Sequence, residues 1–150
     1  MKGSIFYFFL FVFVSCEAQE SSEKNAFNGR ILPENVCRVV KDGATEKPFT
    51  GEFWDHKAEG VYICVACDNP LFSSKEKYSS GSGWPSYYDV LNEGNVKKVD
   101  DFSYGMTRIE IQCAECGGHL GHLFNDGPKP TGMRYCVNSA SLKFRPKSNE

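Results

Sequence analysis

The sequence predicts a mainly β domain, antiparallel in its pairing, with one short helix near its N-terminal end. From Thr50 onward, turn residues interrupt the chain at short intervals, and the segments between them are rich in Val, Ile, Tyr and Phe. No long run of helical periodicity follows Lys41, and we find no internal repeat. A chain of 150 residues has room for a single core of this kind.

The first 18 residues differ from the rest and predict an export signal. Lys2 precedes an unbroken apolar run at residues 5–14, which is short for a membrane span. Cleavage after Ala18 would leave a periplasmic or secreted protein. Cleavage before Cys16 would leave a lipid-anchored one, since residues 13–16 resemble a bacterial lipobox with Phe13 where Leu is usual. The alternative, a buried N-terminal strand, lacks any period of two in this run.

Residues 19–30 are mostly polar and are expected to form a flexible leader before a domain at 31–146, with a tail at 147–150. The domain begins with a predicted helix. Leu32, Val36 and Val39 recur at helical spacing, Pro33 suits the first helical position, and Gly43 ends the run. Cys37 lies on this helix.

Four strands are predicted further along the chain, near residues 61–65, 106–112, 119–124 and 134–144. The segments between them carry turn residues, as in Asn69-Pro70, the glycine-rich stretch 80–85 and the loop 126–132.

The formal charge of −2 and the pI near 5.9 give no basic field for a phosphate backbone, so nucleic acid is not an expected partner.

Four of the seven cysteines form two Cys-x-x-Cys pairs. Two such turns brought together place four thiolates around one Zn²⁺, and a full shell of four thiolates makes the metal structural. For an exported chain a framework of disulfides is the alternative, although disulfide frameworks more often scatter their cysteines. The zinc ligands would be Cys64, Cys67, Cys113 and Cys116.

Cys136 lies outside both pairs and is the candidate reactive thiol. Strand alternation puts Arg134 and Asn138 on the same face as Cys136, where the positive charge of Arg134 would lower the thiol pKa. The plain alternative is a small apolar residue packed in a strand.

Two further features favour chemistry at Cys136. His119 and His122, two of the three histidines, lie close together just after the second cysteine pair, and free imidazoles near a thiol suggest proton delivery. Trp84, held between Gly83 and Pro85, could form the wall of a small apolar pocket.

Together these motifs resemble the B-type methionine sulfoxide reductases over about residues 32–145. The matching segments, in order, are Cys64-x-x-Cys67 with Pro70-Leu71-Phe72, Ser80-Gly81-Ser82-Gly83-Trp84-Pro85-Ser86, Gly118-His119-Leu120-Gly121-His122, Asp126-Gly127-Pro128 and Arg134-Tyr135-Cys136-Val137-Asn138-Ser139. The resemblance implies two antiparallel sheets clamped by zinc, and an enzyme that repairs proteins after oxidative stress by reducing methionine-R-sulfoxide, free or protein-bound.

The same resemblance implies the roles of the site residues. Cys136 would attack the sulfoxide sulfur and become a sulfenic acid. Trp84 would hold the ε-methyl group, while His119, His122 and Asn138 would orient the sulfoxide oxygen and supply protons.

One departure concerns recycling of the enzyme. Many relatives have a resolving cysteine where this chain has Ser82, and serine cannot form a disulfide. Either Cys37 replaces it, or an external, thioredoxin-like reductant attacks the sulfenic acid directly. We expect a monomer.

Two other functions use the same cysteines. A zinc-ribbon-like module that binds a protein partner would keep the metal and bury Cys136, but it would not require His119, His122 and Trp84 beside it. A thiol–disulfide oxidoreductase would use a Cys-x-x-Cys as its redox pair, a motif that normally opens a helix in a βαβ unit.

Overall fold

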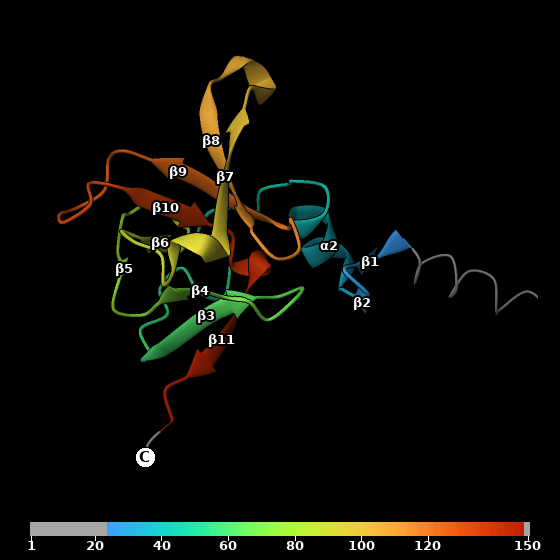
Figure 1. Ribbon diagram of the computed structural model, residues 1–150, viewed down its shortest axis with the longest axis horizontal. Coiled ribbons are helices and arrows are strands. Elements are labelled where there is room, and N and C mark those ends of the chain that lie inside the picture. The colour runs from blue at the N-terminus through green and yellow to red at the C-terminus, as the bar shows by residue number, and fades with distance from the viewer. Residues whose placement is uncertain (1–23, 149–150) are drawn as a thin grey trace, which may run out of the picture.

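A computed structural model describes residues 24–148 of the chain. The expected signal peptide, Cys16 and the first part of the expected leader lie outside the described residues. Figure 1 shows a β domain with a short helix on one side and a long hairpin projecting from it.

From residue 24 onward the expected leader is structured, which differs from the prediction of a flexible segment. Strands β1 (Ala26–Phe27) and β2 (Arg30–Ile31) form a hairpin around Asn28 and Gly29, both with positive φ. Asn-Gly is the preferred pair for such a turn. The Asn28 side chain donates to the Ala66 carbonyl at 3.3 Å, and Arg30 pairs with Asp68, so the hairpin is tied to the first cysteine turn.

Helix α2 (Glu34–Val40) lies where the sequence predicts it. Pro33 occupies the N-cap and not the first helical position. Cys37, Val39 and Val40 are buried on its inner face. Gly43, with φ of 69°, donates to the Val39 carbonyl at 3.1 Å and ends the helix.

Two antiparallel sheets make up the body of the domain, as the resemblance implies (Figure 1). The larger sheet has the order β5-β6-β10-β9-β8-β7 and the smaller one β11-β3-β4. The larger sheet comprises β5 (Lys77–Tyr78), β6 (Ser86–Tyr87), β10 (Arg134–Val137), β9 (His119–Phe124), β8 (Arg108–Cys113) and β7 (Val96–Asp101). The smaller sheet comprises β11 (Leu142–Pro146), β3 (Gly60–Cys64) and β4 (Pro70–Ser73). Short 3₁₀ turns lie at η1 (Glu93–Asn95), η2 (Ser103–Gly105) and η3 (Ser139–Ser141).

Aromatic side chains fill the space between the two sheets. Tyr62 and Phe72 of the smaller sheet meet Tyr87 of the larger one, with ring centroids 5.3 and 4.4 Å apart. All three side chains are fully buried. Fully burying one aromatic side chain stabilises a fold by roughly 1.5–3 kcal/mol, so this cluster fixes the two sheets face to face.

The predicted strand at residues 134–144 is wrong as a single element. It is two strands, β10 and β11, which belong to different sheets and are separated by η3. The Glu46 carboxylate accepts hydrogen bonds from the backbone N–H groups of Ser139 and Ala140 at this turn. The predicted strands at 61–65, 106–112 and 119–124 correspond to β3, β8 and β9.

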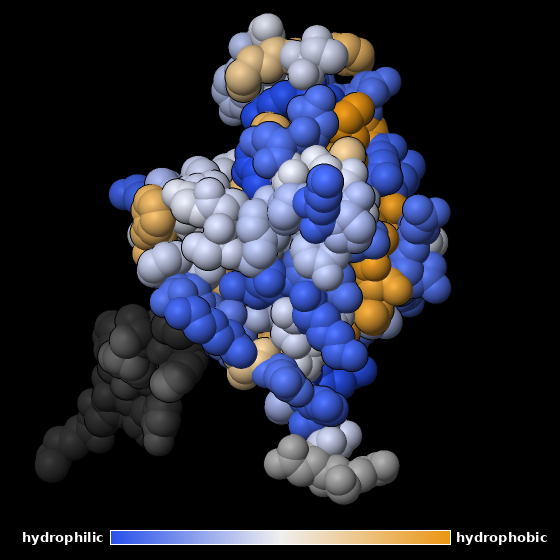
Figure 2. Space-filling model, turned by 90° about the vertical axis from the view of Figure 1, so that its left-hand side faces the viewer, coloured by the Kyte–Doolittle hydropathy of each residue, from blue (hydrophilic) through white to orange (hydrophobic). Residues whose placement is uncertain are grey.

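Figure 2 shows a largely hydrophilic face, with hydrophobic residues gathered in a band along its right-hand side. At the tip of the β7–β8 hairpin, Phe102, Tyr104 and Met106 are exposed. In the part of the chain that the structure describes, no helix has the length and apolar character to cross a bilayer.

Candidate active site and metal centre

Cys136 opens into a small cavity of about 150 Å³ beside the middle of the larger sheet. Strand β10 places Cys136 between His122 of β9 and Ser86 of β6 in the ladder. The residues that line the cavity include Cys136, His122, Asn138, Trp84, Arg108 and Phe124. The structure therefore brings the predicted thiol, one predicted histidine, the indole and the amide to one place.

Burial raises the pKa of the Cys136 thiol, and the nearby positive charge of Arg134 acts in the opposite direction. The expected effect of Arg134 is present, but burial is larger. The Arg134 guanidinium is itself held by Asp126 through hydrogen bonds of 2.7 and 2.8 Å, and it stacks over the Phe124 ring at 4.3 Å. The carboxylate of Asp126 therefore weakens the influence of Arg134 on the thiol.

A bulge in β9 brings the two histidines onto one face. Residues three apart in a regular strand point to opposite faces. Here Gly121 pairs with Ile111 and His119 with Gln112, which leaves Leu120 as an extra residue. The two imidazole rings consequently meet, with centroids 5.6 Å apart.

Each histidine is held by a carboxylate. His122 Nε2 lies 2.8 Å from Asp101 Oδ2, and His119 Nδ1 lies 2.6 Å from Glu110 Oε1. Burial lowers the pKa of His122, while Asp101 acts to raise it. His119 is buried and does not line the cavity of Cys136, and its Nε2 has no hydrogen-bond partner among the described residues.

Asp101, Arg108 and Glu110 belong to the site but were not predicted from the sequence. Arg108 lines the cavity and donates to Asp101 at 2.7 Å. Asp101 and Arg108 face each other across the β7–β8 ladder. If β7 had been predicted as the partner of β8, the pairing would have put Asp101 opposite Arg108. The sequence of β7 is mostly polar and shows no strand pattern.

Asn138 is buried, and both ends of its side-chain amide are bound to backbone. Its Nδ2 donates to the Leu120 carbonyl at 3.1 Å, and its Oδ1 accepts from the Glu46 N–H at 3.0 Å. The Trp84 indole N–H donates to the Glu46 carbonyl at 3.1 Å. Both walls of the cavity are thus attached to Glu46, a residue for which the sequence carried no signal.

Two other residues bear on the recycling of Cys136. Ser82 Oγ lies 4.0 Å from Cys136 Sγ. Cys37 is buried on α2, where its sulfur lies 4.0 Å from the Lys24 carbonyl. Helix α2 contributes no residue to the lining of the Cys136 cavity, so the structure does not bring Cys37 to the reactive thiol.

The four paired cysteines meet at the junction of the two sheets, with all four sulfurs within 4.8 Å of one another. Strand β3 ends at Cys64 and β8 ends at Cys113. The Cys64–Cys116 and Cys67–Cys113 sulfur separations are 3.7 and 3.5 Å. The edge of a tetrahedron with metal–sulfur bonds of about 2.3 Å is about 3.8 Å, so these residues fit a tetrahedral metal ion.

The protonation of the cluster also suits a cation. Hydrogen bonds from Cys64 and from Asn69 lower the pKa of Cys113 to about 4, while burial raises the pKa of Cys67 to about 12. One thiolate is therefore stabilised by the protein alone. The pKa values of Cys64 and Cys67 are raised, and a bound cation would favour their ionisation.

Comparison with known proteins relates the chain to one family. The SelR domain matches residues 32–146. The "Peptide methionine sulfoxide reductase MsrB" of Herminiimonas arsenicoxydans is 56% identical over 114 residues, which are 76% of this chain and 83% of that protein. The protein of the same name from Thiobacillus denitrificans is 56% identical over 121 residues, 81% and 91% of the two chains. "Methionine-R-sulfoxide reductase B3, mitochondrial" of Mus musculus is 55% identical over 108 residues, 72% of this chain and 43% of the mouse protein.

Proposed function

Since the chain belongs to the SelR family and is a peptide-methionine (R)-S-oxide reductase, we propose that Cys136 is the nucleophile with which it reduces methionine-R-sulfoxide in oxidised proteins. The observation that carries this proposal is the cavity itself. It joins a thiol, an indole wall and a carboxylate-bound imidazole in about 150 Å³, a size that suits a methyl sulfoxide group.

The reaction begins with attack of the Cys136 thiolate on the sulfoxide sulfur. The oxygen moves to the cysteine, so that thiol and sulfoxide become sulfenic acid and thioether. The cysteine sulfur loses two electrons and the methionine sulfur gains them. Trp84 provides the apolar surface against which the ε-methyl group packs.

His122 supplies a proton to the sulfoxide oxygen. Asp101, an ionised carboxylate held also by Arg108, accepts a hydrogen bond from the Nε2–H of His122 and so stabilises the imidazolium. This arrangement leaves Nδ1 of His122 for the bound substrate. His119, fixed by Glu110, packs against the His122 ring and limits its movement.

The four-cysteine cluster would hold a structural Zn²⁺ through Cys64, Cys67, Cys113 and Cys116. Four thiolates would fill the coordination of the ion, so the metal would stabilise the fold and take no part in the reduction. The ion would join the end of β3 to the end of β8, and its binding free energy would contribute to folding.

Recycling uses an external thiol, such as that of a thioredoxin-like protein. Ser82 cannot form a disulfide, and Cys37 lies buried beside Lys24. One thiol attacks the sulfenic acid and releases water, and a second thiol releases Cys136 as the free thiol. A Cys37–Cys136 disulfide in the product of a single turnover would instead establish Cys37 as the resolving residue.

Export is part of the same proposal and rests on the composition of residues 1–18. The protein would act as a monomer outside the cytoplasm, either free or anchored by lipid at Cys16. The intact mass of the mature N-terminus separates the two cases, because cleavage after Ala18 leaves Gln19 and lipid attachment adds the mass of the acyl chains to Cys16.

The function is tested with the separate R and S epimers of a capped methionine sulfoxide, dithiothreitol as reductant, and the Cys136→Ser variant as control. We expect turnover of the R epimer alone and no turnover by the variant. A folded, metal-loaded protein that reduces neither epimer would favour a binding module in which Cys136 only packs.

A further inference from the structure

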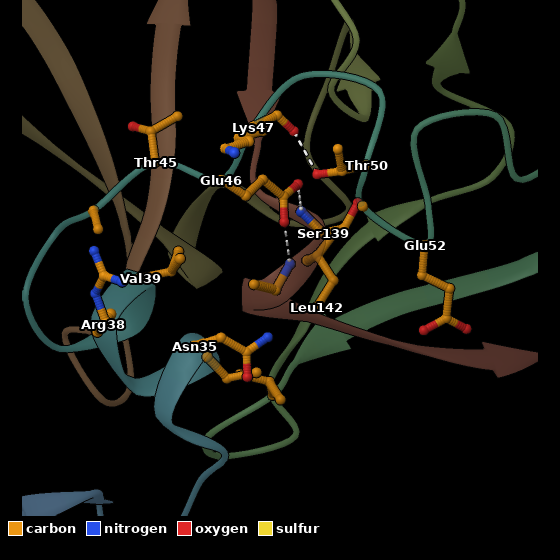
Figure 3. Close-up of a pocket in the computed structure, with 15 residues that line it drawn as sticks. Asn35, Arg38, Val39, Thr45, Glu46, Lys47, Thr50, Glu52, Ser139 and Leu142 are labelled. Atoms are coloured by element: carbon orange, nitrogen blue, oxygen red, sulfur yellow. Dashed lines mark hydrogen bonds between the residues drawn. The ribbon is translucent and has the colours of Figure 1, made fainter.

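Glu46 lies on the loop 44–50 between α2 and β3, at the edge of a second cavity of about 520 Å³. Figure 3 shows its carboxylate directed at the turn that carries Ser139. One carboxylate oxygen accepts from the Ser139 N–H at 2.6 Å and the other from the Ala140 N–H at 3.0 Å. A carboxylate that accepts two backbone N–H bonds forms charge-assisted hydrogen bonds, which are about twice as strong as neutral ones.

The backbone of Glu46 makes two further contacts, and both are to residues that line the cavity of Cys136. Its N–H donates to Asn138 Oδ1 at 3.0 Å, and its carbonyl accepts from the Trp84 indole at 3.1 Å. One residue therefore binds four groups that belong to two separate segments of the chain. Glu46 itself does not line the Cys136 cavity.

Among the described residues, the indole N–H has no second hydrogen-bond partner. The backbone around Trp84 is held by hydrogen bonds from the Phe49 N–H to the Gly83 carbonyl at 2.8 Å and from the Val137 N–H to the Pro85 carbonyl at 2.9 Å. Those bonds hold the backbone of the loop and do not involve the Trp84 ring. Among the described residues, Glu46 is the hydrogen-bond partner that sets the direction of the indole.

We propose that Glu46 is a positioning residue for the sulfoxide pocket, which fixes the indole of Trp84 and the amide of Asn138 relative to Cys136. This role rests on the proposed function of the Cys136 cavity. The carboxylate of Glu46 binds the loop 44–50 to η3, directly after β10. The backbone N–H and carbonyl of the same residue bind the side chains of Asn138 and Trp84, which form the cavity walls. Loss of the carboxylate would remove the two hydrogen bonds that fix the loop to η3, and would let the carbonyl that holds the indole move.

The test compares Glu46→Ala and Glu46→Gln with Glu52→Gln. Glu52 lines the same second cavity and is exposed, and Figure 3 shows it apart from the Ser139 turn. A displacement of about 1 Å in a binding wall can cost up to about 100-fold in rate. We expect Glu46→Ala to raise KM for the R epimer at least about tenfold, with a smaller change in kcat, because the methyl-binding wall is displaced while Cys136 stays in its strand.

Glu46→Gln should give an intermediate effect. It keeps the shape of the side chain but turns one acceptor oxygen into a donor that faces a backbone N–H. Glu52→Gln should behave as the unsubstituted protein.

A second readout reports the position of the indole without any turnover. The chain has two tryptophans, so Trp84 is the only one left in a Trp54→Phe background. In that background Glu46→Ala should shift the Trp84 emission to longer wavelength and increase its quenching by acrylamide, and Glu52→Gln should do neither.

A lower melting temperature with unchanged KM and unchanged Trp84 emission would overturn the proposal and make Glu46 a purely structural residue. If Glu46→Ala does not fold, Glu46→Gln carries both measurements. Absence of turnover in the unsubstituted protein would refute the proposed function, and the emission measurement would still decide the position of Trp84.

Discussion

Gly121 lies on β9 directly against the backbone of β10, one residue before His122. It pairs with Val137 in the ladder. A Cβ added at this position would lie 2.0 Å from the Cys136 carbonyl oxygen and 3.1 Å from the Val137 Cα. Non-bonded carbon atoms prefer separations of about 3.5–4.0 Å, so Gly121→Ala would force the two strands apart by more than about 1 Å.

The size of the effect follows from what this movement would break. Two or three ladder hydrogen bonds at about 1 kcal/mol each would be weakened. Leu120 and Val137, both fully buried, would repack at a cost of about 1–3 kcal/mol. We therefore expect the free energy of unfolding to fall by about 3–6 kcal/mol. Because Cys136 would move relative to His122, kcat/KM should fall about 100-fold in the protein that still folds.

Urea denaturation followed by circular dichroism measures the first quantity, and reduction of the R epimer with dithiothreitol measures the second. Gly132→Ala is the matched control, since its φ of 72° is also positive but no atom lies within 4 Å of the added Cβ. It should cost about 1–2 kcal/mol and leave turnover unchanged. A Gly121→Ala protein within about 1 kcal/mol and threefold of the original in both assays would refute the argument from strand contact.

Three other predictions concern the metal, the thiol and its recycling. Cys113→Ser should lose bound zinc, measured by atomic emission, and melt roughly 10 °C lower, in line with a loss of a few kcal/mol; unchanged melting at saturating zinc would contradict a structural metal. Since burial raises the pKa of Cys136 while Arg134 lowers it and Asp126 raises it, Arg134→Gln should move the pH midpoint of Cys136 alkylation upward and Asp126→Asn downward. Peptide-resolved iodoacetamide labelling reads this midpoint, and two shifts of the same sign would show that the charges do not act on the thiol. Because Ser82 Oγ lies 4.0 Å from Cys136 Sγ, Ser82→Cys should form a disulfide with Cys136 after one turnover without reductant, whereas the unsubstituted protein should give a dimedone adduct at Cys136; a dimedone adduct in both proteins would argue against this geometry.

The parts of the fold that the sequence predicted are those with strong local patterns. Strand β9 agrees at both ends with its prediction at residues 119–124, and helix α2 lies where its apolar spacing placed it. Strand β7 was missed because its exposed side chains are charged, as is common on an edge strand, and it carries no apolar alternation. The division of residues 134–144 between two sheets was missed because the turn between them is held by contacts with residues that are distant in sequence, among them Glu46.

The residues of the candidate site likewise fall into two groups, those that a local motif predicts and those that depend on strand pairing. Cys136, His122, Trp84 and the four paired cysteines could be identified because each lies in a short motif with its own chemistry. The pairing of β7, β8 and β9 brings Asp101, Arg108 and Glu110 to the site. This pairing could not be predicted from the sequence of any one of the three strands. The β9 bulge that brings His119 and His122 together is likewise a property of two strands and not of one.

The passage from β10 through η3 to β11 has a consequence for the order in which a newly made chain matures. The four clustered cysteines lie in β3 and β8 or directly after them, so no residue of β10 or β11 belongs to the candidate metal site. The smaller sheet gains its last strand only when β11 pairs with β3, which was synthesised about half a chain length earlier. Pairings over such long separations form slowly compared with local ones. We therefore expect the folding of the chain to end with the docking of β11 on β3, and the reductase activity to appear in that late step.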